Sequence, residues 1–437
     1  PGPTVRLLHP VAVPAGNGRT SYDALPEIDE SGVVVVDPLT NEQVWADVDC
    51  SGLAPGDYDV TIRCLALNGA GVEEGPTAFY VAIPAPVSEA RLSLKVLDFQ
   101  AAPSSSFHHC NWAYVSGSLL RDYPAATYKD LLDHGTNVFV TNKAAKATFD
   151  DDGRLVGEVD FSAMDEDLSY LRGQDVIVLL QNPPQLQSAS GKYAEGSEVY
   201  KRALVPFLDA LVKHMADFGY STDNFAYYPF DEPGGDGWPS VNIFIQRAKL
   251  VREADPRIQI YVDGGPPSME MYEAMLPYVD IWQSTVHRLP TEGDLQRLPL
   301  MRQKVKQIWT YDGVDEGKTD DVVRNFLADA IYCFVNGITG NGYWTYCTQT
   351  EDPWERTLHE YMIVYPGLDK PVSSRRWEAI RQSIQQYRVL AGLRSLVQQA
   401  EAKGVAPDLC ACAKQLLDTD LPAQVRQAPL TAEAIAT

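Results

Sequence analysis

From about residue 107 to residue 393, short apolar runs alternate with segments whose apolar residues recur at helical spacing. This alternation is typical of βα units around a parallel sheet, because strands covered by helices on both faces are almost continuously apolar. Such runs predict strands at 108–115, 136–142, 175–182, 224–231, 258–264, 279–286, 305–312 and 338–347. Helices are predicted to follow them at 125–134, 162–172, 198–218, 240–254, 268–276, 294–302, 320–336 and 374–393.

Eight strand–helix pairs predict an α/β fold with a (β/α)8 TIM-like barrel over residues 107–393. The competing architecture, an open doubly wound sheet, would carry a glycine-rich phosphate turn after its first strand. The sequence that follows residue 115 contains no such turn. We therefore predict the closed barrel as the main domain.

The flanks of the barrel have different patterns. Residues 1–88 alternate apolar and polar side chains at period two, with turns between the runs, which is typical of antiparallel strands. Strands are predicted there at 33–36, 42–48, 58–66 and 77–83. We expect an N-terminal β-sandwich over 1–88, a linker over 89–106, and a C-terminal helical appendage and tail over 394–437.

The acidic composition argues against some partners. A net charge of −23 disfavours nucleic acid and anionic lipid surfaces, whose phosphates attract Lys and Arg, but it does not disfavour a neutral sugar. The sequence contains no run of about 18 apolar residues, so we expect no membrane-spanning helix. The chain begins at Pro1 rather than Met, so we expect that a signal peptide has been removed or left out and that the protein is secreted or periplasmic.

The cysteines and histidines do not predict a metal site or another cofactor. Cys410 and Cys412 have no second pair nearby, and His108 and His109 lack a carboxylate at helical spacing, so no zinc-ligand pattern is formed. Seven cysteines are an odd number, which argues against a complete disulfide framework. Cys50 and Cys64 could pair, or all seven could be free thiols.

Aromatic, amide and acidic residues gather at the ends of the predicted strands. In a barrel these carboxyl ends meet at one face, where substrates bind. Aromatic rings pack on the C–H face of a sugar while amides and carboxylates bond its hydroxyls, whereas a phosphate site would need cations and glycine amides. The set predicts a carbohydrate site: Trp112, Asn142, Asn182, Asp231, Glu232, Asp263, Trp282, His287, Trp309, Tyr311, Asp312, Trp344 and Tyr346.

Each of these residues also has a purely structural interpretation. A strand tryptophan is more often core than sugar platform, Asp263 precedes two glycines and could serve a turn, and His287 could be a surface residue. The gathering of such residues at one end of the strands is what favours a binding site.

Asp231 and Glu232 are the candidate catalytic pair. Ordinary retaining glycosidases hold two carboxyls about 5–5.5 Å apart, commonly on different strands. Neighbouring strand residues face opposite ways, but at the end of a strand, with Pro233 bending the chain, both can reach the mouth. This arrangement suits a reaction in which the 2-acetamido oxygen of the substrate is the nucleophile. Asp231 would stabilise the oxazolinium cation, and Glu232, with a raised pKa, would act as acid and then base.

Three stretches resemble glycoside hydrolase family 123 and its relatives: Tyr228–Pro233, Gly340–Tyr346 and Tyr365–Arg381. The resemblance is clear over about 225–390, diffuse over 107–224 and architectural over 1–90. The family comprises retaining β-N-acetylgalactosaminidases with an N-terminal β-sandwich and a barrel. The resemblance implies that Asp231 stabilises the acetamide and that Glu232 is the acid/base. We interpret the third stretch, including Arg376, as an ion-paired start of the eighth helix.

Two alternatives remain open on the sequence. A barrel glycosidase acting on another sugar could use Glu232 as acid/base and Asp312, at the end of the seventh strand, as nucleophile. A non-catalytic glycan-binding protein could keep the aromatic cluster without turnover. The retained Asp231–Glu232 pair argues against the second alternative.

Overall fold

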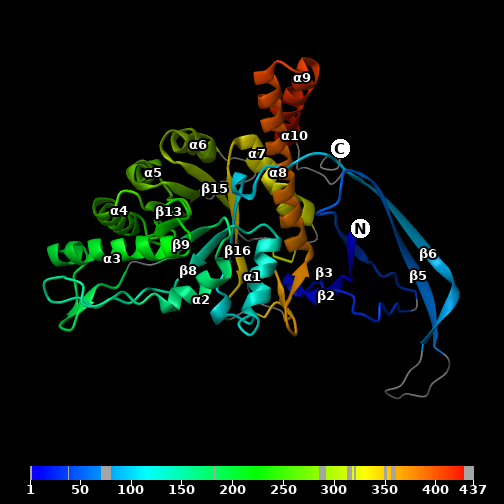
Figure 1. The fold of residues 1–437 in the computed structure, drawn as a ribbon, viewed down its shortest axis with the longest axis horizontal. Coiled ribbons are helices and arrows are strands. Elements are labelled where there is room, and N and C mark those ends of the chain that lie inside the picture. Colours follow the sequence, from blue (N-terminus) through cyan, green and yellow to red (C-terminus); the bar gives the residue numbers. More distant parts are fainter. Residues whose placement is uncertain are drawn as a thin grey trace. The chain divides into compact units, whose positions relative to one another are not determined.

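The computed structural model describes residues 2–37, 39–69, 80–181, 184–284, 292–312, 317–318, 321–348, 352–355 and 361–427. These residues form two compact units (Figure 1). The first comprises Pro1–Pro10 and Pro26–Gln100, and the second comprises Val11–Leu25 and Ala101–Thr437. Each unit has its own strand pairing.

The second unit contains a closed barrel of eight parallel strands, which confirms the predicted fold class. Each strand lies inside the range predicted for it, and the barrel closes where β16 pairs with β7. The strands are β7 (His108–Ala113), β8 (Val138–Thr141), β9 (Ile177–Gln181), β12 (Phe225–Tyr228), β13 (Gln259–Asp263), β14 (Ile281–Ser284), β15 (Gln307–Asp312) and β16 (Gly340–Cys347).

Helices follow the barrel strands close to the predicted positions. The predicted helix at 320–336 is divided, because a π turn over Val323–Leu327 precedes α7. The other large difference between the predicted and the observed helices is in α8, which continues ten residues beyond its predicted end at 393 to Lys403. The helices are α1 (Pro124–Asp133), α2 (Ser162–Leu171), α3 (Glu198–Asp217), α4 (Trp238–Ala254), α5 (Met269–Met275), α6 (Glu292–Lys304), α7 (Asp329–Asn336) and α8 (Arg375–Lys403).

Two apolar layers stabilise the barrel. One lies between the strands and the helices, and the other fills the barrel interior with inward side chains at period two, among them Cys110, Trp112 and Tyr261. Gly342 of β16 makes room in the interior, since a Cβ there would lie 2.0 Å from Nε2 of Gln283 and 2.7 Å from the carbonyl oxygen of Cys110. The absence of a side chain at Gly342 therefore leaves the space that the amide of Gln283, from β14, occupies beside β16.

A hairpin from the N-terminal region belongs to the barrel unit. Its strands β2 (Val11–Pro14) and β3 (Thr20–Leu25) form one sheet with β17 (Tyr365–Pro366) and β18 (Pro371–Ser374), in the order β17-β18-β3-β2. The division of the chain therefore differs at residues 11–25 from the predicted N-terminal domain of 1–88.

A buried ion pair fixes this hairpin to the start of α8. Asp23 lies 2.9 Å from the guanidinium of Arg376, and the hydroxyl of Tyr365 donates to the same carboxylate at 2.7 Å. Both charged side chains are almost completely buried. Removing one partner of such a pair typically costs about 3–5 kcal/mol, so residues 11–25 are an integral part of the barrel fold. The predicted ion-paired start of the eighth helix is thus present, with Asp23 as a partner that the sequence did not indicate.

The first unit is antiparallel in its regular elements. Strand β1 (Thr4–Leu8) pairs with β4 (Trp45–Asp49), and β5 (Gly56–Gly69) pairs with β6 (Tyr80–Val96). The predicted strand at 33–36 has no regular structure, and β6 extends into the predicted linker. Cys50 and Cys64 of this unit are free cysteines, so the pairing that the sequence left open is not formed.

Residues 407–427, which follow the barrel, contain two further helices. Helices α9 (Pro407–Gln415) and α10 (Leu421–Gln427) follow the end of α8 (Figure 1). Over the described residues, the structure contains no helix with the length and apolar character needed to cross a membrane.

Candidate active site

Asp231 and Glu232 lie just beyond the carboxyl end of β12, and both are exposed to solvent. Pro229 and Pro233 flank this segment and have no N–H to continue the strand ladder. Glu232 has a φ of 43°, in the left-handed region that residues other than glycine rarely occupy. Strain of this kind is concentrated at functional sites. The turn therefore directs two neighbouring carboxyls to the end of the barrel where catalytic residues are found.

Asp231 is held by a tyrosine of the barrel interior. The hydroxyl of Tyr228 donates to Oδ1 of Asp231 at 2.5 Å. Tyr228 is fully buried, and its ring packs edge-on against Tyr261 with ring centroids 4.8 Å apart. Because the ring of Tyr228 is fixed by packing, its hydroxyl gives the exposed carboxylate of Asp231 a defined position.

Glu232 is held through its backbone and through the packing of its stem. Its N–H donates to Oδ1 of Asp263 at 2.9 Å. Its side chain crosses Gly264, where an added Cβ would lie 3.3 Å from Cγ of Glu232. Although the side chain of Glu232 reaches solvent, the groups packed around its carboxyl desolvate it in part and so raise its pKa, and the charge of Asp231 adds to this effect. A carboxyl with a raised pKa keeps its proton to higher pH, as a general acid requires.

An aromatic cluster lies among the inward side chains at the same end of the barrel. Trp112 contacts Tyr311 and Trp344, with centroids 5.1 Å and 6.3 Å apart, and Tyr114 contacts Trp344 at 5.9 Å. Burial, followed by the charge of Asp231, raises the pKa of Tyr114. Burial and the charges of Asp263 and Glu232 do the same for the pKa of Tyr311. These electrostatic effects show that the aromatic cluster and the carboxyls are neighbours.

The structure thus brings six of the predicted residues together: Trp112, Asp231, Glu232, Asp263, Tyr311 and Trp344. Asn142 is exposed and follows β8 at the same end of the barrel. Asn182 and His287 lie outside the described residues, as does the side chain of Asp312 at the end of β15. Their predicted roles remain predictions.

Three of the predicted binding residues require correction, because their side chains lie elsewhere. Trp282 faces the helices, where it stacks on Tyr272 at 4.7 Å and donates to the carbonyl of Gly264. Tyr346 also faces outward, where its hydroxyl donates to Asp130 of α1 at 2.7 Å. Trp309 points inward but is fully buried against His108, near the opposite end of the barrel. All three are core residues.

Two tyrosines of the site were missed in the sequence. The hydroxyl of Tyr228 donates a hydrogen bond to Asp231. The hydroxyl of Tyr261, among the inward side chains of the barrel, donates to Oε1 of Gln283 at 2.5 Å. Tyr261 stands two positions before Asp263, whose side chain points inward. Because side chains two positions apart in a strand face the same way, the sequence could have indicated that Tyr261 also points inward. Tyr228 stands three positions before Asp231. The bend between them interrupts the strand alternation, so the spacing does not indicate that the two side chains are in contact.

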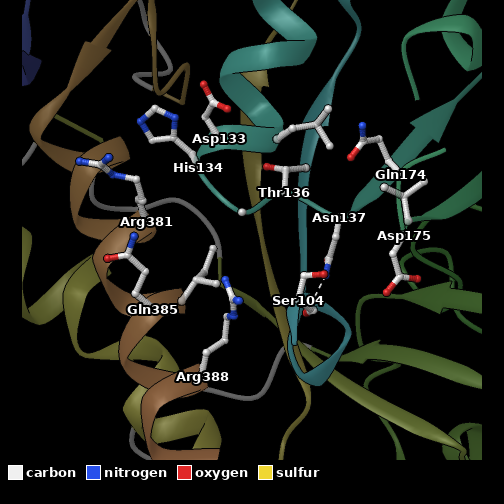
Figure 2. A pocket seen from close by; sticks show the side chains of 14 residues that line it. Ser104, Asp133, His134, Thr136, Asn137, Gln174, Asp175, Arg381, Gln385 and Arg388 are labelled. Atoms are coloured by element: carbon white, nitrogen blue, oxygen red, sulfur yellow. Dashed lines mark hydrogen bonds between the residues drawn. The ribbon is translucent and has the colours of Figure 1, made fainter. Parts of the chain in front are cut away.

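A cavity lies at the end of the barrel opposite to Asp231 and Glu232. Figure 2 shows Arg381, Gln385 and Arg388 of α8 on one side of it, facing Asn137 and the segment that precedes β9. The cavity volume is about 180 Å³. Nε of Arg388 donates to the carbonyl of Ala102 at 2.8 Å, which joins α8 to the segment before β7. Because it lies at the amino ends of the strands, this cavity is separate from Asp231 and Glu232.

The described residues also provide no obvious place for a catalytic metal. No group of three or more His, Cys, Asp and Glu side chains in this part of the chain could hold a metal ion.

Comparison with known proteins connects this site with a family. Residues 177–393, which include Asp231 and Glu232, match the family model described as glycoside hydrolase 123, catalytic domain. No curated protein matches the chain. Among solved structures, a family 123 glycoside hydrolase from Clostridium perfringens is similar in fold, with a TM-score of 0.60, 12% identity, and coverage of 96% of this chain and 79% of that chain.

Two further solved structures have lower similarity. A family 39 β-xylosidase from Caulobacter crescentus has a TM-score of 0.41 and 14% identity over 65% of this chain and 72% of that chain. An endo-β-1,4-mannanase from Thermotoga petrophila has a TM-score of 0.41 and 11% identity over 65% of this chain and 77% of that chain. On the match that covers its paired carboxyls and six of its barrel strands, this chain belongs to the glycoside hydrolase 123 family.

Proposed function

We propose that this glycoside hydrolase removes β-linked N-acetylgalactosamine from glycans with retention of configuration, by substrate-assisted catalysis. The observation that carries the proposal is the arrangement of Asp231 and Glu232 at the end of β12. Asp231 is fixed by Tyr228, while Glu232 has a raised pKa and is held through its own backbone. Two adjacent carboxyls of unlike environment suit two different roles on one substrate.

Glu232 is the proposed acid and base. In the first step its carboxyl gives a proton to the glycosidic oxygen while the bond from that oxygen to the anomeric carbon breaks. The acetamido oxygen forms the new bond to the anomeric carbon, giving an oxazolinium ion. In the second step the carboxylate of Glu232 takes a proton from water, whose oxygen attacks the anomeric carbon. The bond from that carbon to the acetamido oxygen breaks, which opens the oxazolinium ring and restores the acetamide. Two displacements restore the original configuration.

Asp231 is the proposed partner of the acetamide. Its carboxylate would accept the acetamide N–H, turn the carbonyl oxygen toward the anomeric carbon, and stabilise the positive charge of the oxazolinium ion. Tyr228 already fixes one of its oxygens, which leaves the other for the substrate. Preorganisation of this kind lowers the cost of orienting the acetamide.

The walls of the site support a sugar substrate. Tyr114, Tyr311 and Trp344 are partly buried rings beside the acids, and such rings pack on the C–H face of a sugar. The similar enzyme from Clostridium perfringens hydrolyses glycolipid glycans, which supports a glycan as the substrate class.

A comparison of three aryl glycosides tests the proposal. We expect hydrolysis of the aryl β-N-acetylgalactosaminide, weaker hydrolysis of the β-N-acetylglucosaminide, and none of the β-galactoside, which has no acetamide. Release of the aryl alcohol gives the rate. Comparable cleavage of the plain galactoside would instead favour an enzyme nucleophile, and a fluorosugar would then show whether Asp312 is labelled. Binding without turnover across the panel would contradict the proposed hydrolysis.

A further inference from the structure

The hydroxyl of Tyr228 lies between two carboxyls. Its oxygen is 2.5 Å from Oδ1 of Asp231 and 2.5 Å from Oδ2 of Asp263. Tyr228 and Asp263 are buried, whereas Asp231 is exposed. The other oxygen of Asp263 accepts the N–H of Glu232. Asp263 is therefore connected to both members of the catalytic pair, to one through a side chain and to the other through the backbone.

The number of protons in this arrangement is limited. A phenol has one O–H and can donate to one carboxylate, while an ionised carboxylate can only accept. If Asp231 and Asp263 were both ionised, one of the two short contacts would join two oxygens with no proton between them. A second proton must therefore lie on a carboxyl. Asp263 is the better position because it is buried, whereas Asp231 can be solvated by water.

We propose that Asp263 is a neutral carboxylic acid that donates to Tyr228, so that Tyr228 donates in turn to the carboxylate of Asp231. In this series of hydrogen bonds Asp263 and Tyr228 are positioning residues, and Asp263 also orients the backbone of Glu232. The inference rests on the proposed function for the roles of Asp231 and Glu232. The chain of hydrogen bonds itself follows from the geometry.

The surroundings of Asp263 favour the neutral form. Burial, followed by the charge of Asp231, raises the pKa of Asp263 well above its usual range. Burial also raises the pKa of Tyr228, so its hydroxyl keeps the proton that it donates. The titratable groups that face Asp263 are carboxyls, phenols and a thiol, and none of them can carry a positive charge that would stabilise an ionised Asp263: Asp231, Glu232, Tyr228, Tyr261, Tyr311, Tyr114 and Cys110.

An asparagine at position 263 tests this inference because it copies the neutral acid. Its oxygen can accept from Glu232 and its N–H can donate to Tyr228. We expect kcat/KM of Asp263→Asn on the aryl β-N-acetylgalactosaminide to stay within about 10-fold of wild type, while Asp263→Ala and Tyr228→Phe lose about 10- to 100-fold. A loss for Asp263→Asn as large as that for Asp231→Asn would overturn the inference, because it would require an ionised Asp263.

Thermal unfolding across pH gives a readout that does not depend on the substrate. A carboxyl whose pKa is raised by folding stabilises the protein fully below its unfolded pKa, and this stabilisation is lost as the pH rises through the folded pKa. Asparagine has no proton to lose. We therefore expect the Tm of Asp263→Asn to gain on wild type as the pH rises above about 4. A Tm of Asp263→Asn that falls relative to wild type, or keeps a constant offset from it, as the pH rises would contradict the inference, even if the enzyme proves to hydrolyse a different sugar.

Discussion

Replacing Glu232 with glutamine is expected to lower kcat/KM for an aryl β-N-acetylgalactosaminide by about 10²–10⁴-fold, the usual contribution of a positioned general acid/base. The amide keeps the shape of the side chain and its packing across Gly264, but it has no acidic proton. The loss should be smallest for leaving groups that depart without protonation, such as dinitrophenolate, and largest for an alkyl alcohol. Initial rates on leaving groups of graded acidity measure this dependence.

Glu253→Gln is a matched control for this experiment. Glu253 is an exposed residue of α4, so the same chemical change at this position should leave the rates unaltered. An equal loss on all leaving groups for Glu232→Gln would contradict a role in proton donation, because damage to the fold or to binding would not depend on the departing group.

Replacing Asp231 with asparagine is the second change with a large expected effect. Removing the charge that stabilises the oxazolinium ion should cost about 10²–10³-fold in kcat, as for other groups that face developing charge. A thiazoline analogue of the oxazoline should also bind more weakly to this variant than to wild type. Asp209→Asn, at an exposed position of α3, provides the matched control. Unchanged turnover of Asp231→Asn would remove the acetamide role.

The same variant changes the pH dependence in a defined direction. The first step needs Glu232 protonated, so activity falls as the pH rises through its pKa. The charge of Asp231 contributes to raising that pKa. In Asp231→Asn the pKa of Glu232 should therefore fall, and the alkaline limb of the residual activity should move to lower pH. A limb that stays in place would show that another group sets it.

The sequence predicted the barrel well because buried parallel strands leave a strong local signal. Each of the eight strands falls inside its predicted range, and the candidate pair at 231 and 232 lies at the expected end of β12. These features depend on local hydrophobic runs and on the bend that Pro233 imposes. They do not require knowledge of distant contacts.

The incorrect predictions at the site concern which face of its strand each side chain occupies. The place of a residue in the sequence does not by itself fix that orientation. Trp282 and Gln283 are neighbours in β14, and it is the glutamine that points inward beneath Gly342. Tyr346 has the spacing of an inward residue, but the register of β16 shifts between Tyr343 and Cys347, so its side chain points to the helices. A bulge of this kind changes which residues face the interior.

The hairpin at 11–25 could not be assigned because its partners are distant in sequence. Period-two alternation indicates a strand but not the edge on which it pairs. Here β3 pairs with β18, which lies more than 340 residues further along the chain. Asp23 gives no local sign of its contact with Arg376. Long-range strand pairing and buried ion pairs are properties of the folded chain.

The central claim, attack by the acetamido oxygen of the substrate, is tested most directly by weakening that oxygen as a nucleophile. Successive fluorination of the N-acetyl group withdraws electrons from the carbonyl and changes little else. We predict that kcat/KM falls steeply along the series from N-acetyl to N-trifluoroacetyl aryl β-galactosaminides. A rate that stays constant across the series would show that the acetamide does not attack, and it would contradict the mechanism assigned to Asp231 and Glu232.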